Sequence, residues 1–283
     1  MRSYLSVWKK TLILLLLSAT ICMGTKAQEG DIGVELYSFR NQLAKDVPGT
    51  LMKIRKMGFS VVEGGSTYGM QPEEFKGLLD EIGLRMVSIG ADFNELADNP
   101  EGVAARAKLF GAQFVVCFWV PHEGKFTEED AKKAIEVFNH AGRILKEKGF
   151  SLCYHPHGYE FLPWQQGTLF DYMVQELNPE FCNFEMDVFW IKHPGQDPVA
   201  LLKKYPDRFL LMHLKDREPG TQGNQLGQAD VESNVTLGKG DIDIKAIMQE
   251  ARKINNIKHY FIEDESSRSE DQVPQSLAFL KKL

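Results

Sequence analysis

Short apolar runs alternate with amphipathic stretches along the chain from residue 31 onward. The runs are almost continuously apolar, as expected of strands that are buried on both faces. They begin near residues 32, 60, 85, 114, 150, 181, 209 and 258. A stretch with helical spacing follows each run, for example PEEFKGLLDEIG at 72–83 and the long segment 127–149. The pattern therefore predicts eight strand–helix units.

Eight such units within about 250 residues favour an α/β fold in which the strands close into a (β/α)₈ TIM barrel. Gly58, Gly83 and Gly149 follow three of the predicted helices, at positions that favour a left-handed cap. No linker, low-complexity tract or change in composition divides residues 28–283. We therefore expect these residues to form one domain.

The first 27 residues have a different pattern. Arg2, Lys9 and Lys10 precede the apolar run TLILLLLSATIC, and the small residues of TKA follow at 25–27. This order is typical of a secretory signal peptide, and the run is shorter than the roughly 20 residues of a membrane span. We expect a cleaved signal peptide at 1–27, a periplasmic or secreted protein and no stable membrane anchor. A retained N-terminal anchor is the alternative.

The charge balance becomes more acidic if that segment is removed. Four basic residues and no acidic ones would leave with it, so the net charge would fall from −6 to −10. An acidic surface repels phosphate backbones, which argues against a nucleic-acid partner. The remaining cysteines, Cys117, Cys153 and Cys182, each lie in an apolar run and indicate small buried side chains. No disulfide framework is visible.

Polar side chains gather at the ends of the last four predicted strands. In TIM barrels the chemistry lies at the carboxyl ends of the strands. A single acid at a strand end is usually a helix cap or a solvated group. Here four consecutive strands end in this way, which favours one shared site. Its candidates, in chain order, are His155, His157, Glu160, Asp187, His213, Lys215 and Glu263.

Carboxylates and imidazoles that converge on one point repel each other or stay unpaired unless a cation holds them. A mixed set of histidine and carboxylate ligands suits a divalent ion such as Mn²⁺, Co²⁺, Mg²⁺ or Zn²⁺. The cysteines are not among the candidates, which argues against a structural zinc site. The pattern predicts one bound divalent metal ion.

Several motifs, taken together, resemble the sugar phosphate isomerase/epimerase superfamily, the xylose isomerase-like barrels, over residues 30–283. The motifs are GVELYSFR in the first strand, YHPHGYEF after the fifth, MDVFW in the sixth, MHLKD in the seventh, LGKGDIDIKAI in the following loop and YFIEDE in the eighth. The resemblance implies that a Glu, Asp, His and Glu from strands five to eight hold the metal. Asp187, His213 and Glu263 match the last three.

The fifth-strand ligand is left open by the sequence. Many relatives place a glutamate at the strand end, where this chain has His155, and the nearest carboxylate is Glu160 in the loop. We expect Glu160 to be the ligand, because a carboxylate lowers the net charge of the site as it does in the family. His155 is the alternative ligand.

The resemblance implies chemistry at a carbon next to a carbonyl, through an enediolate that a divalent ion stabilises. Glu263 would be both ligand and base, and His155, His157 or Lys215 would deliver a proton. The sequence leaves open whether the product arises by isomerisation, epimerisation, elimination or hydration. Some exported relatives are similar to enzymes that process 3-keto-glycosides, so we expect an unphosphorylated keto-sugar or 3-keto-glycoside as substrate. The oligomeric state is not indicated.

Substrate contacts are expected from His157 and from Glu35 in the first motif. Trp119 and Trp190 follow strands four and six, where an indole can stack on a sugar ring or simply pack at the rim. A non-catalytic periplasmic sugar-binding protein is the alternative function, and it would not require converging carboxylates. A metal-dependent nuclease on this barrel is disfavoured, because such sites gather more histidines and the chain here is acidic.

Overall fold

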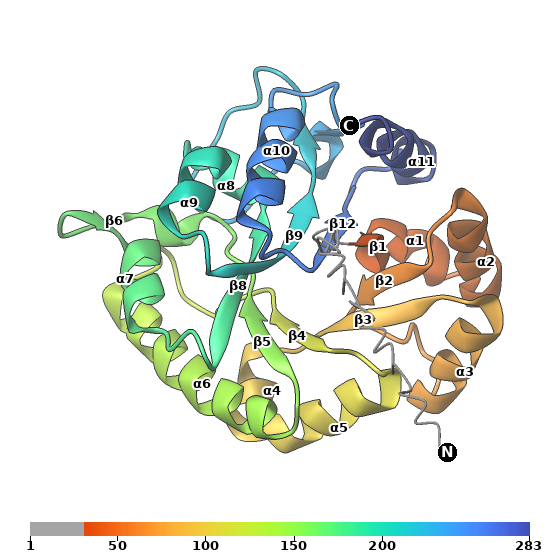
Figure 1. Ribbon diagram of the computed structural model, residues 1–283, viewed down its shortest axis with the longest axis horizontal. Helices are drawn as coiled ribbons and strands as arrows, with labels where there is room; N and C mark the ends of the chain where they lie inside the picture. Colours follow the sequence, from red (N-terminus) through yellow and green to blue (C-terminus); the bar gives the residue numbers. More distant parts are fainter. Residues whose placement is uncertain (1–30) are drawn as a thin grey trace, which may run out of the picture.

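The computed structural model describes residues 31–283, so the predicted signal peptide at 1–27 lies outside the described residues. Eight parallel strands close into a barrel in the order β1-β12-β9-β8-β5-β4-β3-β2 (Figure 1). This confirms the predicted (β/α)₈ fold. The barrel strands are β1 (Asp31–Glu35), β2 (Val61–Gly64), β3 (Arg85–Gly90), β4 (Phe114–Cys117), β5 (Ser151–Tyr154), β8 (Cys182–Asp187), β9 (Phe209–Leu214) and β12 (His259–Ile262).

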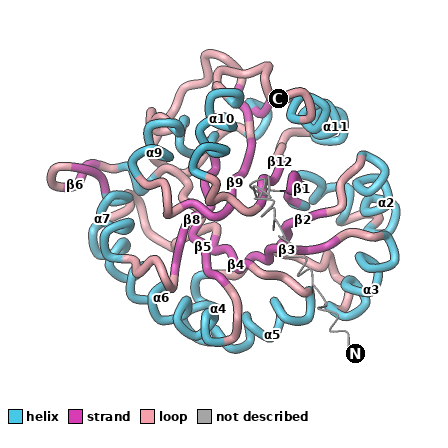
Figure 2. The backbone as a smooth tube through the Cα atoms, viewed as in Figure 1, coloured by secondary structure: helices cyan, strands magenta, loops and turns pink. Residues whose placement is uncertain are grey.

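Helices surround the barrel, and Figure 2 shows them as an outer ring around the central strands. They are α1 (Arg40–Leu43), α2 (Val47–Met57), α3 (Pro72–Ile82), α4 (Phe93–Asp98), α5 (Pro100–Phe110), α6 (Glu128–Glu147), α7 (Leu169–Glu176), α8 (Val188–Lys192), α9 (Pro198–Lys204), α10 (Ile244–Ile254) and α11 (Ser269–Leu280). No helix within residues 31–283 is long and apolar enough to cross a membrane.

Local sequence signals set the ends of several helices. Thr127 caps α6 in a capping box with Asp130, which satisfies backbone N–H groups at the start of the helix. Gly58 ends α2 with φ 107° and Gly83 ends α3 with φ 79°, a left-handed conformation that glycine adopts without strain. The predicted glycine caps of these two helices are confirmed.

The sixth predicted strand was expected to end at Asp187, and β8 ends at that residue. The apolar run continues to Trp190 because α8 begins directly after the strand. The Asp187 carboxylate accepts hydrogen bonds from the backbone N–H groups of Phe189 and Trp190 and so caps α8. Two short two-stranded antiparallel sheets were not predicted. In one, β6 (Pro163–Trp164) pairs with β7 (Gly167–Thr168), and in the other β10 (Asp216–Arg217) pairs with β11 (Asn234–Val235).

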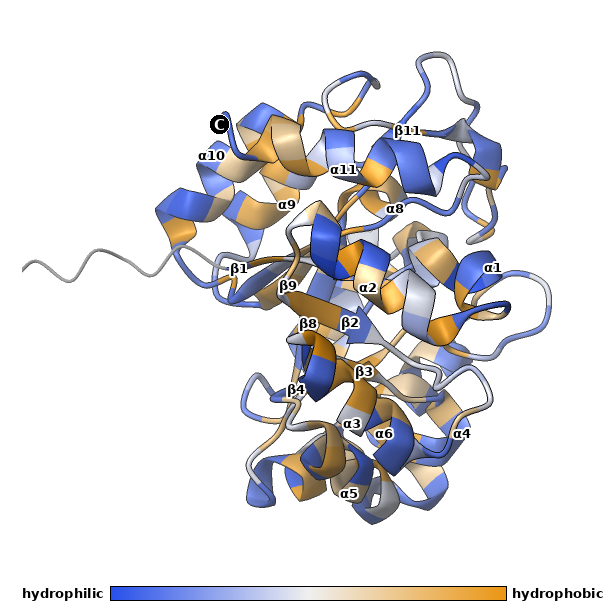
Figure 3. Cartoon of the chain, turned by 90° about the vertical axis from the view of Figure 1, so that its right-hand side faces the viewer, coloured by the Kyte–Doolittle hydropathy of each residue, from blue (hydrophilic) through white to orange (hydrophobic). Residues whose placement is uncertain are grey.

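The apolar core has two parts. The larger part lies mainly between the barrel and the helices, and the smaller one includes Val61, Leu211 and Phe261. Figure 3 shows hydrophobic residues along the central strands and on parts of the surrounding helices. Because side chains two residues apart on a strand share a face, the residues that follow Leu211 and Phe261 on the same face are His213 and Glu263. The alternation of side chains along the strands thus places His213 and Glu263 directly above the smaller part of the apolar core.

Candidate metal centre

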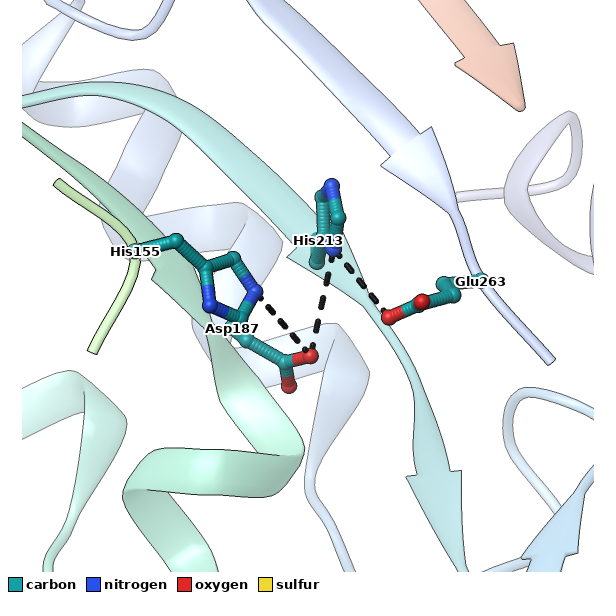
Figure 4. A group of neighbouring side chains, drawn as sticks. All are labelled: His155, Asp187, His213 and Glu263. Carbon is teal, nitrogen blue, oxygen red and sulfur yellow. Dashed lines mark hydrogen bonds and ion pairs between the residues drawn. The ribbon is translucent and has the colours of Figure 1, made fainter. Parts of the chain in front are cut away.

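Four polar side chains converge at the carboxyl ends of β5, β8, β9 and β12. One ligand atom from each of His155, Asp187, His213 and Glu263 lies within 4.8 Å of the other three. Asp187 Oδ2 is 3.6 Å from His155 Nε2 and 3.9 Å from His213 Nδ1. His213 Nδ1 is in turn 3.2 Å from Glu263 Oε2 (Figure 4). The four side chains come from four consecutive strands of the barrel.

These separations fit a metal ion. Two ligand atoms that lie about 2.1 Å from an ion, at a tetrahedral angle, are about 3.4 Å apart. The three separations between these side chains, from 3.2 to 3.9 Å, bracket that value. Asp187 Oδ2 is buried and has no hydrogen-bond partner within the described residues. A buried carboxylate oxygen without a partner is costly unless a cation compensates it.

His155 follows β5 and is held by the neighbouring strand. Its backbone N–H donates to the carbonyl of Cys117 at 3.0 Å, and Pro156 comes next. Burial, together with the nearby His213, lowers the pKa of His155 to about 3. The imidazole is therefore neutral at neutral pH, and a ring nitrogen is free to act as a metal ligand.

Lys215 lies two residues beyond His213 on the same face and is almost fully buried. Its Nζ is 3.1 Å from Glu263 Oε2 and also donates to Glu265. Burial alone would lower the pKa of Lys215, but the carboxylates of Glu263 and Glu265 outweigh it and hold that pKa above its usual value. In return, Lys215 and His213 keep the pKa of Glu263 well below its usual range despite burial. The structure therefore pairs an ammonium with a carboxylate at the site.

Glu160 lies elsewhere, so the geometry does not support the expectation that it is the fifth-strand ligand. Its carboxylate accepts hydrogen bonds from the Tyr154 hydroxyl and from the backbone N–H groups of His157 and Gly158. Burial raises the pKa of Glu160 to about 7, although these donors favour the charged form. The left-handed Gly158, at φ 98°, turns the chain so that Glu160 folds back onto its own loop. His155 occupies the fifth-strand position in the cluster.

The remaining predicted site residues line a cavity of about 830 Å³ above the cluster, in which Glu35, Trp119, His157 and Trp190 all take part. His157 Nδ1 is 3.3 Å from His155 Nδ1, and burial and His155 hold the pKa of His157 well below its usual value. Trp119 is 38% exposed, and its ring stacks on that of His122.

Three further carboxylates near the cluster were missed by reading strand ends alone. Glu63 on β2 and Glu185 on β8 are fully buried, and Glu63 Oε1 is 2.5 Å from His213 Nε2. Glu185 precedes Asp187 by two residues, so strand alternation could have placed both on the inner face. Glu265 lies two residues beyond Glu263, also past the end of β12, and was not singled out among the acidic residues of YFIEDE.

The fold and the site define a TIM barrel with a candidate metal centre at the carboxyl ends of its strands. The chain belongs to the xylose isomerase-like TIM barrel family, whose sequence profile matches residues 51–283. This confirms the resemblance that the motifs indicated.

Individual relatives include enzymes of carbohydrate chemistry. Inosose dehydratase of Geobacillus kaustophilus (strain HTA426) is 23% identical over 216 residues, which cover 65% of this chain and 68% of the relative. Several other inosose dehydratases match over less than half of their own length. A sugar phosphate isomerase/epimerase structure from Parabacteroides distasonis ATCC 8503 has a TM-score of 0.75 and 25% identity, covering 91% of this chain and 96% of the other.

A zinc-containing structure shares the fold as well. The crystal structure of IOLI protein with a bound zinc atom has a TM-score of 0.69 and 14% identity, covering 89% of this chain and 97% of the other. These relatives are named as enzymes, and this chain is an enzyme as well. A non-catalytic sugar-binding role is therefore not favoured.

Proposed function

We propose that the protein is a divalent-metal-dependent enzyme that removes a proton from a carbon next to a carbonyl in an unphosphorylated keto-sugar or 3-keto-glycoside. The product would arise by isomerisation or epimerisation, or by elimination or hydration. The observation that carries the proposal is the convergence of His155, Asp187, His213 and Glu263 beneath a cavity, with Lys215 beside them. We assign His155 rather than Glu160 as the fourth ligand.

A divalent ion held by these four residues would polarise the substrate carbonyl as a Lewis acid. Glu263 is suited to accept the proton, because its low pKa keeps it ionised at neutral pH. Lys215 is suited to donate a hydrogen bond to the oxygen on which charge develops, since its raised pKa keeps it protonated. His155 and His157 are neutral at that pH, which disfavours both as proton donors. Lys215 is thus our candidate acid.

The cavity walls carry little free positive charge. Among the Lys and Arg residues that line it, Lys215 is ion-paired with Glu263 and Glu265, and Arg40 donates to the carbonyls of Tyr37 and Glu265. A phosphate group would therefore have only the Arg40 guanidinium to pair with. Trp119 and Trp190 instead offer aromatic surface of the kind that packs against a sugar ring. Export and the lack of a nucleic-acid partner remain predictions from the sequence.

Isotope exchange tests the reaction class even when the product has not been identified. The protein is loaded with Mn²⁺ and incubated in heavy water with aldoses, ketoses and 3-keto-glycosides, and the sugars are examined by NMR. We expect deuterium at the carbon next to the carbonyl, or loss of the group at the β-carbon. The matched control is Asp187→Asn, which removes a ligand charge and should show neither. Retention of protium in every sugar, with metal bound, would refute the proposal.

A further inference from the structure

The cavity above the candidate metal centre is larger than one sugar ring requires. Its volume is about 830 Å³, and cavities of about 300–1,000 Å³ hold drug-sized ligands, which exceed a single sugar ring. At its inner end the lining residues are buried, for example His213 at 1% and Glu263 at 9% exposure. Tyr37 at 48% exposure and the half-buried Tyr68 line its outer end. A keto-sugar ring at the metal ligands therefore leaves the outer end free for a second group.

Tyr68 lies in a turn whose backbone does not favour tyrosine. The Met70 N–H donates to the Thr67 carbonyl at 3.1 Å and closes the turn. Its two central residues are both left-handed, with φ 53° at Tyr68 and φ 86° at Gly69. Such turns favour Gly, Asn or Asp at both central positions, and a bulky residue with positive φ is strained. A smaller residue at position 68 would therefore suit the fold better.

The strained turn leaves the Tyr68 side chain in the wall of the cavity. The ring packs against that of Phe75 on α3, with the two centroids 6.4 Å apart. The Tyr68 hydroxyl has no hydrogen-bond partner within residues 31–283. Burial raises the pKa of Tyr68, and the nearby Glu35 adds to the effect, so the phenol is neutral at neutral pH. Strain of this kind is found at ligand-binding sites, where it serves binding rather than folding.

We propose that Tyr68 and Tyr37 form a second subsite, which binds the group attached to the keto-sugar of a glycoside when that group is itself a ring. Aromatic side chains pack well against an uncharged ring, and the free Tyr68 hydroxyl can hydrogen-bond to it. Arg40 lies 4.5 Å from the Tyr37 ring centroid and covers one face of that ring, so Tyr68 is the main contact. The subsite rests on the proposed function, because it assumes that the keto-sugar ring lies at the metal ligands.

Calorimetric titration tests the subsite. The full chain, loaded with Mn²⁺, is titrated with methyl glucoside, phenyl glucoside and cellobiose, the two glucosides as both anomers. These ligands carry no ketone and do not react, so binding is measured apart from the chemistry. We expect phenyl glucoside, cellobiose or both to bind about 10-fold more tightly than methyl glucoside. A gain for cellobiose identifies the second group as a sugar, and a gain for phenyl glucoside alone identifies it as an aromatic ring.

Tyr68→Asn should abolish this preference without lowering the melting temperature in circular dichroism, because asparagine suits the left-handed turn. The matched control is Tyr172→Asn on α7, whose ring packs against Trp164 and does not line the cavity. This control should keep the preference. The comparison of ligands in the parent protein does not depend on either variant.

Equal affinities of the parent protein for the three ligands, or a preference that Tyr68→Asn retains, would overturn the subsite. A parent protein that binds none of these ligands would overturn it as well. The proposed function fails on a different result, the absence of deuterium exchange from every sugar, so the two failures are distinguishable. A preference that only Tyr68→Asn removes would support the subsite even if no sugar exchanged deuterium.

Discussion

Replacing Glu160 with glutamine tests whether this carboxyl supports the turn after β5 rather than a metal ion. The side chain is fully buried, and it receives hydrogen bonds from Tyr154 and from two backbone N–H groups of its own loop. Burial raises its pKa to about 7, from an ordinary value of 4.5. Glutamine keeps the shape of the side chain and removes its titration.

The magnitude follows from the difference between the folded and unfolded pKa values. The folded state binds the proton of Glu160 more tightly, so the stability that this group contributes is fully present below about pH 4.5 and is lost as pH rises through about 7. Each pH unit between these values is worth about 1.4 kcal/mol. The parent protein should therefore lose about 3 kcal/mol relative to Glu160→Gln over this range.

Urea unfolding of both proteins, stripped of metal and measured from about pH 4.5 to about pH 8, gives the two free energies of unfolding. We expect the difference between the variant and the parent to shift by about 3 kcal/mol in favour of the variant as pH rises. Metal content at neutral pH should be equal in the two proteins. A difference that does not change with pH, or a loss of metal from Glu160→Gln, would refute the assignment of Glu160 to the turn.

Three further substitutions test a metal ligand, the candidate acid and the packing of a loop against Tyr159. His155→Gln should weaken Mn²⁺ binding in equilibrium dialysis by at least 10–100-fold, the loss that follows from removing an outer-shell partner of a ligand; unchanged affinity would exclude His155 as a ligand. Lys215→Met should slow deuterium exchange by about 10²–10⁴-fold with metal content intact, and a rate within a few-fold of the parent would exclude it as the acid. Gly227→Ala places a Cβ at a residue with φ 68°, 2.7 Å from the Tyr159 ring. It should lower the free energy of unfolding in urea by about 1–3 kcal/mol. An unchanged free energy of unfolding would show that the loop around Gly227 shifts to accommodate the methyl group.

The barrel could be predicted from the sequence because each strand is an uninterrupted apolar run followed by a helical period. Asp187, His213 and Glu263 could be placed together for the same reason, since each lies at or just past the end of such a run. Their convergence then follows from the closed order of the strands.

The path of the chain after β5 could not be predicted. Glu160 lies five residues beyond His155, and its position depends on the left-handed turn at Gly158 and on hydrogen bonds within the loop. The spacing of hydrophobic residues along the chain does not indicate such contacts. The inner carboxylates were missed for a different reason, because Glu63 and Glu185 lie within apolar runs where strand alternation, rather than strand ends, marks the inward face.

Anomalous diffraction from crystals grown with Mn²⁺ locates the ion relative to each candidate ligand. We expect an anomalous peak about 2.0–2.3 Å from His155, Asp187, His213 and Glu263. A peak that Glu160 coordinates in place of His155, or no peak within reach of Asp187, His213 and Glu263, would show that these four residues do not form the metal centre.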